Sequence, residues 1–204
     1  MTCLWATAVL AMLGILGTGL WARRQAGEAD QSKPDRLEAL YDAPSFTLTD
    51  QDGKTVTRDS LHGSVWVAMV FFTQCPGVCP AMTMRMTEVQ KHIASPQVKI
   101  VSFTLDPEHD TPEAMKVYAD RFQTDQSRWL FLTGPKDTMY EIASGLKLVA
   151  VPAHDGQPIL HTQKVLLVDG GGKVRGVYDT NDDDSMKQLA SDAMSLARQT
   201  GTHS

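Results

Sequence analysis

One stretch decides how this chain folds: Phe71-Phe72-Thr73-Gln74-Cys75-Pro76-Gly77-Val78-Cys79-Pro80. The continuous apolar run that leads into it, residues 65–72, is typical of a strand buried on both faces. After it, the pattern predicts a helix that starts with Pro80 at its first position and runs to about Ile93. The stretch therefore joins a central strand to a helix, and the turn between them carries two cysteines.

The two cysteines of this turn are separated by three residues, so both sulfurs can face one side of the helix start. Two thiolates on one side can hold a soft metal or close into a disulfide, and the spacing leaves both chemistries open. Because a helix N-terminus carries partial positive charge, we expect lowered thiol pKa values at Cys75 and Cys79. An inert buried pair or a static disulfide is less expected, since neither needs this turn or its flanking prolines.

On either side of the stretch, strand patterns alternate with helix patterns. A hairpin is expected over 46–57, and a glycine-rich turn pairs strand 164–168 with strand 173–178. The other predicted elements are strands at 98–104 and 129–132, helices at 111–122, 136–144 and 183–198, and a loop at 151–158. This order predicts an α/β fold, a sheet with helices on its faces.

A third group can complete a metal site with the cysteines. His161 enters the strand that follows the loop at 151–158, and loops at strand ends in such a sheet converge beside the cysteine turn. Two thiolates and one imidazole suit Cu(I), and they can also hold Cu(II). By position alone, an ordinary hydrogen-bonded or solvent-facing histidine is an equal alternative.

The remaining candidates have simpler interpretations. Met82 and Met86 share a helix face, which favours core packing over thioether ligation, and Met84 lies off that face. The acids of segment 106–110 suit turn and cap roles, with a second role in orienting residues near the cysteine turn left open. The acids 182–184 fit the first turn of a helix. Surface positions are expected for the other histidines, namely His62, His92, His109, His154 and His203.

The N-terminal residues 1–22 carry no charged side chain and are predicted to form a transmembrane anchor or a signal segment. We favour a retained anchor, because the apolar stretch is longer than a typical signal core. Cys3 lies within it and is expected to be a small apolar residue of that helix. A polar tether at 23–43, a folded domain at 44–199 and a tail at 200–204 complete the predicted organisation.

Composition limits the function classes. The chain has 204 residues, enough for one domain with an appendage, and a formal net charge of −5. A nucleic-acid role is not expected, because no surplus of Lys and Arg gathers in one region. Three cysteines do not make a disulfide scaffold.

The chain resembles the Sco/SenC family of membrane-tethered copper proteins used in assembling cytochrome c oxidase. The resemblance covers about Asp42 to Arg198 and rests on three stretches: Thr73 to Pro80, Ser102 to Glu113, and His161 with the following 165–169. It implies a thioredoxin-like fold with a central mixed sheet, and copper bound by Cys75, Cys79 and His161. It also implies delivery of copper to the binuclear copper centre of the oxidase subunit.

The resemblance further implies a location and partners. The domain is expected to face the periplasm from a bacterial inner membrane or, alternatively, the mitochondrial intermembrane space, although Arg23 and Arg24 after the anchor favour the opposite orientation. A reductant protein is implied, because a disulfide cannot ligate as two thiolates. Relatives usually carry aspartates where this chain has Gly77 and Leu160, which changes hydrogen bonding and docking but keeps the ligand types.

A metallochaperone, rather than an enzyme, is therefore the expected function. The alternative is a thiol-disulfide oxidoreductase that keeps partner cysteines reduced, against which the three-residue spacer weighs. A peroxidase that forms a sulfenic acid is a third and less expected possibility.

Overall fold

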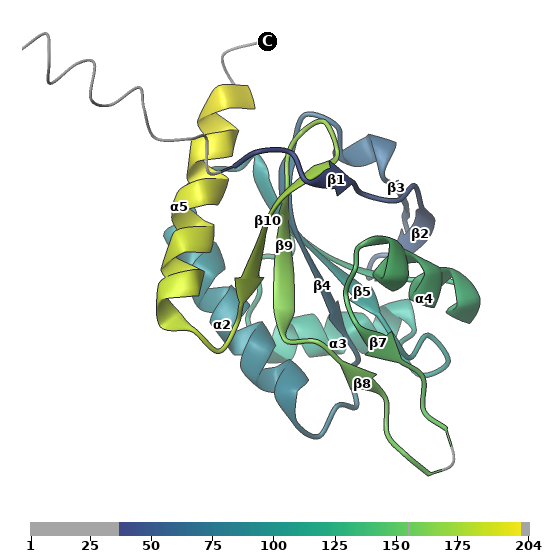
Figure 1. Ribbon diagram of the computed structural model, residues 1–204. Helices are drawn as coiled ribbons and strands as arrows, with labels where there is room; N and C mark the ends of the chain where they lie inside the picture. Colours follow the sequence, from purple (N-terminus) through teal and green to yellow (C-terminus); the bar gives the residue numbers. More distant parts are fainter. Residues whose placement is uncertain (1–36, 155, 201–204) are drawn as a thin grey trace, which may run out of the picture. The chain divides into compact units, whose positions relative to one another are not determined.

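The computed structural model describes residues 37–154 and 156–200 of the chain. Within them the main sheet has eight strands in the order β1-β10-β9-β4-β5-β6-β2-β3. Their bounds are β1 (Tyr41–Asp42), β2 (Thr47–Asp50), β3 (Thr55–Thr57), β4 (Val65–Phe71), β5 (Val98–Thr104), β6 (Trp129–Thr133), β9 (Lys164–Val168) and β10 (Lys173–Asp179). A separate two-stranded ladder joins β7 (Ala150–Val151) to β8 (Leu160–His161) (Figure 1).

The main sheet is parallel at its centre and antiparallel at its flanks. β4, β5 and β6 run parallel, with Val65 opposite Val98 and Phe71 opposite Thr104. β9 pairs antiparallel with β4, β10 with β9, and β2 with β6. Because the parallel strands end at one edge, the segments that follow β4 and β5 emerge side by side.

β4 is the buried centre of the fold. Each of its residues is at most 1% exposed, as expected for an apolar strand that is covered on both faces. On one face Trp66 packs with Phe103 and Phe46, and on the other Phe71 packs against Tyr118, with 5.6 Å between the ring centroids. Alternate side chains of the strand therefore build two separate core layers.

Helices cover both faces of the main sheet. α2 (Val78–His92) packs along α5 (Asp183–Thr200) and contacts α3 (Pro112–Arg121), while α4 (Lys136–Gly145) covers the layer that contains Trp66 (Figure 1). A short 3-10 helix, η1 (Asp59–Leu61), lies between β3 and β4. The predicted α/β fold with helices on both faces of a sheet is confirmed.

Two local features differ from the sequence prediction. α2 begins at Val78 after Gly77, which moves Cys79 into the first turn and puts Pro80 at the third helical position. Proline is tolerated there because the first amides of a helix have no intrahelical acceptor. The loop expected at 151–158 is also bracketed by β7 and β8, so it is the tip of a hairpin.

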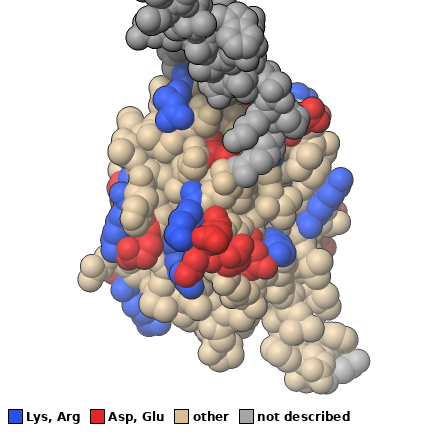
Figure 2. Space-filling model, turned by 60° about the vertical axis from the view of Figure 1, so that its left-hand side comes forward, with Lys and Arg blue, Asp and Glu red and all other residues tan. Residues whose placement is uncertain are grey.

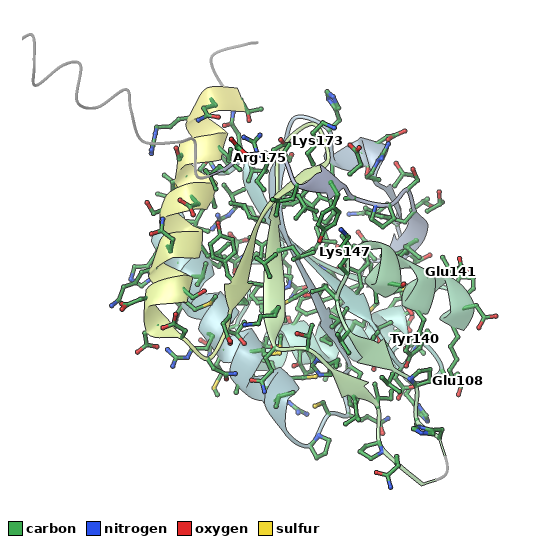
Figure 3. The ribbon with its side chains drawn as sticks, viewed as in Figure 1. Glu108, Tyr140, Glu141, Lys147, Lys173 and Arg175 are labelled. Carbon is green, nitrogen blue, oxygen red and sulfur yellow. The ribbon has the colours of Figure 1, made fainter. Side chains whose placement is uncertain are left out.

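The N-terminal predictions fall on a part of the chain that is largely outside the described residues. The anchor predicted over 1–22 lies there, as does most of the tether at 23–43, but β1 within that tether pairs with β10. Tyr41 of β1 donates its hydroxyl to the Leu146 carbonyl (2.9 Å) and lies under the ammonium group of Lys147, which Figure 3 labels. None of the described helices is long and apolar enough to cross a membrane.

Candidate metal centre

The cysteine turn leaves the end of β4 and enters α2. The Cys75 N–H donates to the Phe72 carbonyl (3.3 Å), which coils the turn, and the Cys79 N–H lies 3.5 Å from the Cys75 sulfur. Both cysteines are free thiols, with Cys79 fully buried and Cys75 half-buried. The two sulfurs therefore share one side of the helix start, and one of them is open to an approaching partner.

His161 approaches these sulfurs from the β7–β8 hairpin, where it pairs with Ala150. Its Nε2 lies 3.0 Å from the Cys79 sulfur, and its Nδ1 lies 2.9 Å from the Thr162 carbonyl oxygen. A carbonyl can only accept, so Nδ1 carries the proton and the lone pair of Nε2 faces the thiol. Phe72 packs edge-on against the imidazole, with 5.9 Å between the ring centroids.

The structure thus brings together the three side chains that the sequence singled out. Cys75, Cys79 and His161 each offer one ligand atom, and these atoms all lie within 4.8 Å of one another. Among the described residues, this is the one group of three or more His, Cys, Asp or Glu side chains that is close enough to hold a metal ion.

Burial dominates the electrostatics of the site. It raises the pKa of the Cys79 thiol far above its usual value, and the neighbouring Cys75 raises it further. The expectation of a lowered thiol pKa at the helix N-terminus is therefore wrong for Cys79, because desolvation outweighs the helix dipole. Burial also lowers the pKa of His161, which keeps the imidazole neutral and able to ligate.

The other histidines lie apart from this cluster. His109 pairs with Asp106 (2.8 Å), which raises the pKa of that histidine. Nδ1 of His92 bonds the Glu88 carbonyl and Nδ1 of His154 the Pro152 carbonyl, while His62 is exposed. These four have surface positions, as predicted, whereas His203 lies outside the described residues.

The methionines of α2 and the acids at the start of α5 have the structural roles that the sequence favoured. Met82 and Met86 are buried in the core, whereas Met84 is exposed. The acids 183–184 form the first turn of α5, where Asp183 pairs with Arg85 and Asp184 with Lys187. Acidic and basic side chains lie next to one another on the face drawn in Figure 2. This part of the surface therefore carries paired charges and no single-sign patch.

Sequence reasoning missed the hairpin that carries His161. Each of its strands has two residues, too few for the alternation that marks a strand. A weak signal existed in the apolar residues that flank the loop at 151–158. The segments on either side of this loop pair as a ladder because Ala150 and Ile159 pack against the core.

A strand-to-helix turn with two thiols, facing a histidine from a neighbouring hairpin, defines a thioredoxin-like protein with a candidate soft-metal site. The SCO1/SenC family model matches residues 35–197, and the chain belongs to that family.

Individual relatives agree with this assignment. The SCO1 protein homolog of Bacillus subtilis (strain 168) is 36% identical over 160 residues, which are 74% of this chain and 82% of the relative. BsSco, a member of the Sco family of cytochrome c oxidase assembly proteins, has a structure that matches with a TM-score of 0.70 and 34% identity, covering 79% of this chain and 96% of BsSco. Bradyrhizobium japonicum ScoI, solved with copper bound, matches with a TM-score of 0.64 and 28% identity, over 76% of this chain and 98% of ScoI.

Two positions near the site, Gly77 and Leu160, are those at which the resemblance leads us to expect aspartates in relatives. Gly77 caps α2 with no side chain, and a Cβ placed there would meet nothing within 4 Å. Leu160, directly before the histidine, is 54% exposed. Gly77 lies between the two cysteines in the sequence and Leu160 directly before the histidine, so we call these two positions the rim of the site.

Proposed function

We propose that this protein binds copper through Cys75, Cys79 and His161 and passes it on during assembly of cytochrome c oxidase. One observation carries the proposal: the three ligand atoms of these side chains lie within 4.8 Å of one another. Membership of the SCO1/SenC family and the copper-bound structure of Bradyrhizobium japonicum ScoI support the choice of metal. The proposed recipient is the binuclear copper centre of the oxidase subunit.

The donor set fits copper. Thiolate sulfur is a soft ligand that favours Cu(I), and imidazole nitrogen suits both oxidation states. A site with three protein ligands leaves a position at which a recipient ligand can attach before a protein ligand leaves. Cys75 is half-buried and Cys79 fully buried, so we place the exchange on the Cys75 and His161 side of the metal.

Loading the site requires proton release. The raised pKa of Cys79 means that its thiol is protonated at neutral pH before a metal arrives. Binding replaces that proton, because the thiolate is the metal ligand. His161 needs no such exchange, since burial lowers its pKa and its Nε2 is already unprotonated.

The test is an anaerobic Cu(I) titration of the reduced full-length protein against a competing chelator. We expect about one Cu(I) per chain, and a Cys79→Ser variant that competes at least about a hundredfold less well. His92→Ala is the matched control, because His92 lies on a solvent-facing part of α2. A His161→Ala variant with unchanged affinity would remove that residue from the site.

A second function, thiol-disulfide exchange, is favoured by the free thiol pair in which Cys75 is accessible. In this reaction Cys75 would attack a partner disulfide and Cys79 would resolve the mixed disulfide, leaving the partner reduced and this pair oxidised. The assay is turnover of a disulfide substrate with a thiol reductant. Activity that is lost in Cys75→Ser and unchanged in His161→Ala would favour this function over copper binding.

We also propose the organisation predicted from the sequence: an anchor at 1–22, a tether at 23–43, a domain at 44–199 and a tail at 200–204. The domain is placed in the periplasm or, alternatively, in the mitochondrial intermembrane space, with a reductant protein that restores the thiols. Protease treatment of intact and permeabilised cells tests the placement. Digestion of the domain only after the inner membrane is opened would contradict it.

A further inference from the structure

Asp110 is a buried carboxylate beside the cysteine turn that is not among the candidate ligands. It is 0% exposed, although residues 106–109 before it and Thr111 after it are exposed or half-buried. An unpaired buried carboxylate is strongly unfavourable, so the groups that bond to it indicate its role.

The partners of Asp110 come from the ends of two adjacent strands. The Thr73 N–H donates to both carboxylate oxygens (3.1 and 3.2 Å), and the Thr73 hydroxyl donates to Oδ1. The hydroxyl of Thr104, the last residue of β5, donates to Oδ2. One side chain therefore ties the start of the cysteine turn to the neighbouring strand.

The segment that carries Asp110 is itself held in place. The Thr104 hydroxyl accepts from the Asp106 N–H (2.9 Å), which directs its own proton toward Asp110. The Asp110 N–H donates to the Asp106 carbonyl (2.9 Å), which closes the turn. From α4, the Tyr140 hydroxyl donates to the Leu105 carbonyl (3.0 Å), beside the exposed Glu108 (Figure 3). The Asp110 carboxylate is thus held in place by its own segment, and Thr73 bonds to it.

We propose that Asp110 is the positioning residue of the metal centre, holding the turn so that the Cys75 sulfur stays within reach of Cys79 and His161. The inference rests on the proposed copper function. Thr73 lies two residues before Cys75, and the next backbone bond of the turn runs from Cys75 N–H to Phe72. Gly77, further along, adds no side-chain contact. A shift of Thr73 is therefore passed directly to the Cys75 sulfur.

Variants of Asp110 and Thr73 can separate the effect of the hydrogen bonds to this carboxylate from the effect of its charge. Asp110→Ala removes every acceptor and leaves the buried Thr73 N–H unpaired. Asp110→Asn keeps one oxygen for Thr73 and offers an amide donor to the Thr104 oxygen, so it preserves the clamp without the charge. Thr73→Val removes one hydroxyl bond at nearly constant shape. Positioning therefore predicts that the alanine variant is most affected and the asparagine variant least.

The experiment measures Cu(I) affinity and the thiolate-to-Cu(II) absorption band in the full-length protein. Relative to wild type we expect about a 10- to 100-fold loss of affinity in Asp110→Ala, about threefold to tenfold in Thr73→Val, and less than about threefold in Asp110→Asn. A shifted absorption band should accompany the loss in Asp110→Ala. If that variant does not fold, Thr73→Val carries the test alone.

Asp192→Ala is the matched control. Asp192 is also buried, and it accepts from the Tyr178 hydroxyl (2.8 Å) where α5 packs on β10. We expect this variant to lose stability and keep its copper affinity and absorption band. Wild-type affinity in Asp110→Ala or in Thr73→Val, or equal losses in the alanine and asparagine variants, would overturn the inference. A wild-type protein that binds no copper would instead overturn the proposed function.

Discussion

The cysteine turn and the β7–β8 hairpin supply their side chains to one site from very different surroundings. The turn continues from β4, whose residues are at most 1% exposed, and Asp110 ties it to β5. The hairpin pairs only two residues on each strand, and its side chains Val149, Val151 and Leu160 are exposed. The cysteine turn is therefore anchored to the core, with Cys79 buried and Cys75 half-buried, whereas the half-buried imidazole is carried by a short hairpin with exposed apolar side chains.

This difference assigns separate roles to the two halves of the site. Segments with few buried contacts open locally at low free energy, while a central strand opens only when the whole domain unfolds. We expect the histidine half to move while the cysteine half stays in place. His161 would then be the first protein ligand to leave during copper exchange.

The largest expected effect tests how the two regions are packed. Phe71→Ala, at the end of β4, should lower the free energy of unfolding by about 3–5 kcal/mol, because it opens a cavity beside Tyr118 and Phe131. Leu160→Ala in the hairpin should change it by less than about 0.5 kcal/mol. Urea denaturation of the full-length protein measures both. Equal losses of unfolding free energy in the two variants would contradict the difference in packing between β4 and the hairpin.

Amide hydrogen exchange sharpens the same comparison without a mutation. Paired amides of β7 and β8 should exchange at least about a hundredfold faster than those of β4, because the hairpin can open locally. The measurement is mass spectrometry or NMR on the protein without metal. Protection of the hairpin as strong as that of β4 would contradict a mobile histidine half.

The pH dependence of copper affinity reports on the cysteine half. The pKa of Cys79 is raised, so copper must displace its proton, and affinity should rise at least about tenfold per pH unit between about pH 6 and pH 8. The pKa of His161 is lowered by burial, so this histidine loses its proton at a lower pH than an ordinary histidine and adds less slope over this window. A flat profile over this range would show that Cys79 does not lose a proton on binding.

The smallest effect is expected at the rim of the site. Gly77→Asp introduces a carboxylate where a Cβ meets nothing within 4 Å, and Leu160→Asp does so at an exposed position. Each should change Cu(I) affinity by less than about threefold, because a Cβ at position 77 meets no other atom and the side chain at position 160 is exposed. Chelator competition measures this. A larger change at Leu160 alone would indicate that the hairpin controls the geometry of His161.

Sequence reasoning succeeded where a pattern extends over many residues. The apolar run of β4 and the helix after it were predictable because burial on both faces and helical periodicity leave long signals. The two-residue strands β7 and β8 were not, because they depend on contacts made by distant parts of the chain. The three candidate site residues could be named, but position alone left His161 equal to an ordinary histidine, and the full set came from the resemblance to the Sco/SenC family.

The electrostatics of the site were harder to predict from the sequence. A helix N-terminus predicts a lowered thiol pKa, but the pKa of Cys79 depends on burial, which only the packed structure reveals. For segment 106–110 the sequence left a role in orienting the cysteine turn open beside turn and cap roles, and only the packed structure places Thr73 and Thr104 against Asp110. Long-range contacts, rather than local patterns, determine both properties.

The hydrogen bond from the His161 Nδ1 to the Thr162 carbonyl has a consequence for how the rim can vary. Its acceptor is a backbone oxygen, so the bond does not depend on which side chain stands at position 162. The hairpin backbone is held in turn by the bond from the Thr162 N–H to the Val149 carbonyl (2.9 Å). Backbone groups therefore set the orientation of the imidazole, and we expect replacements at the exposed position 160 to leave both bonds in place.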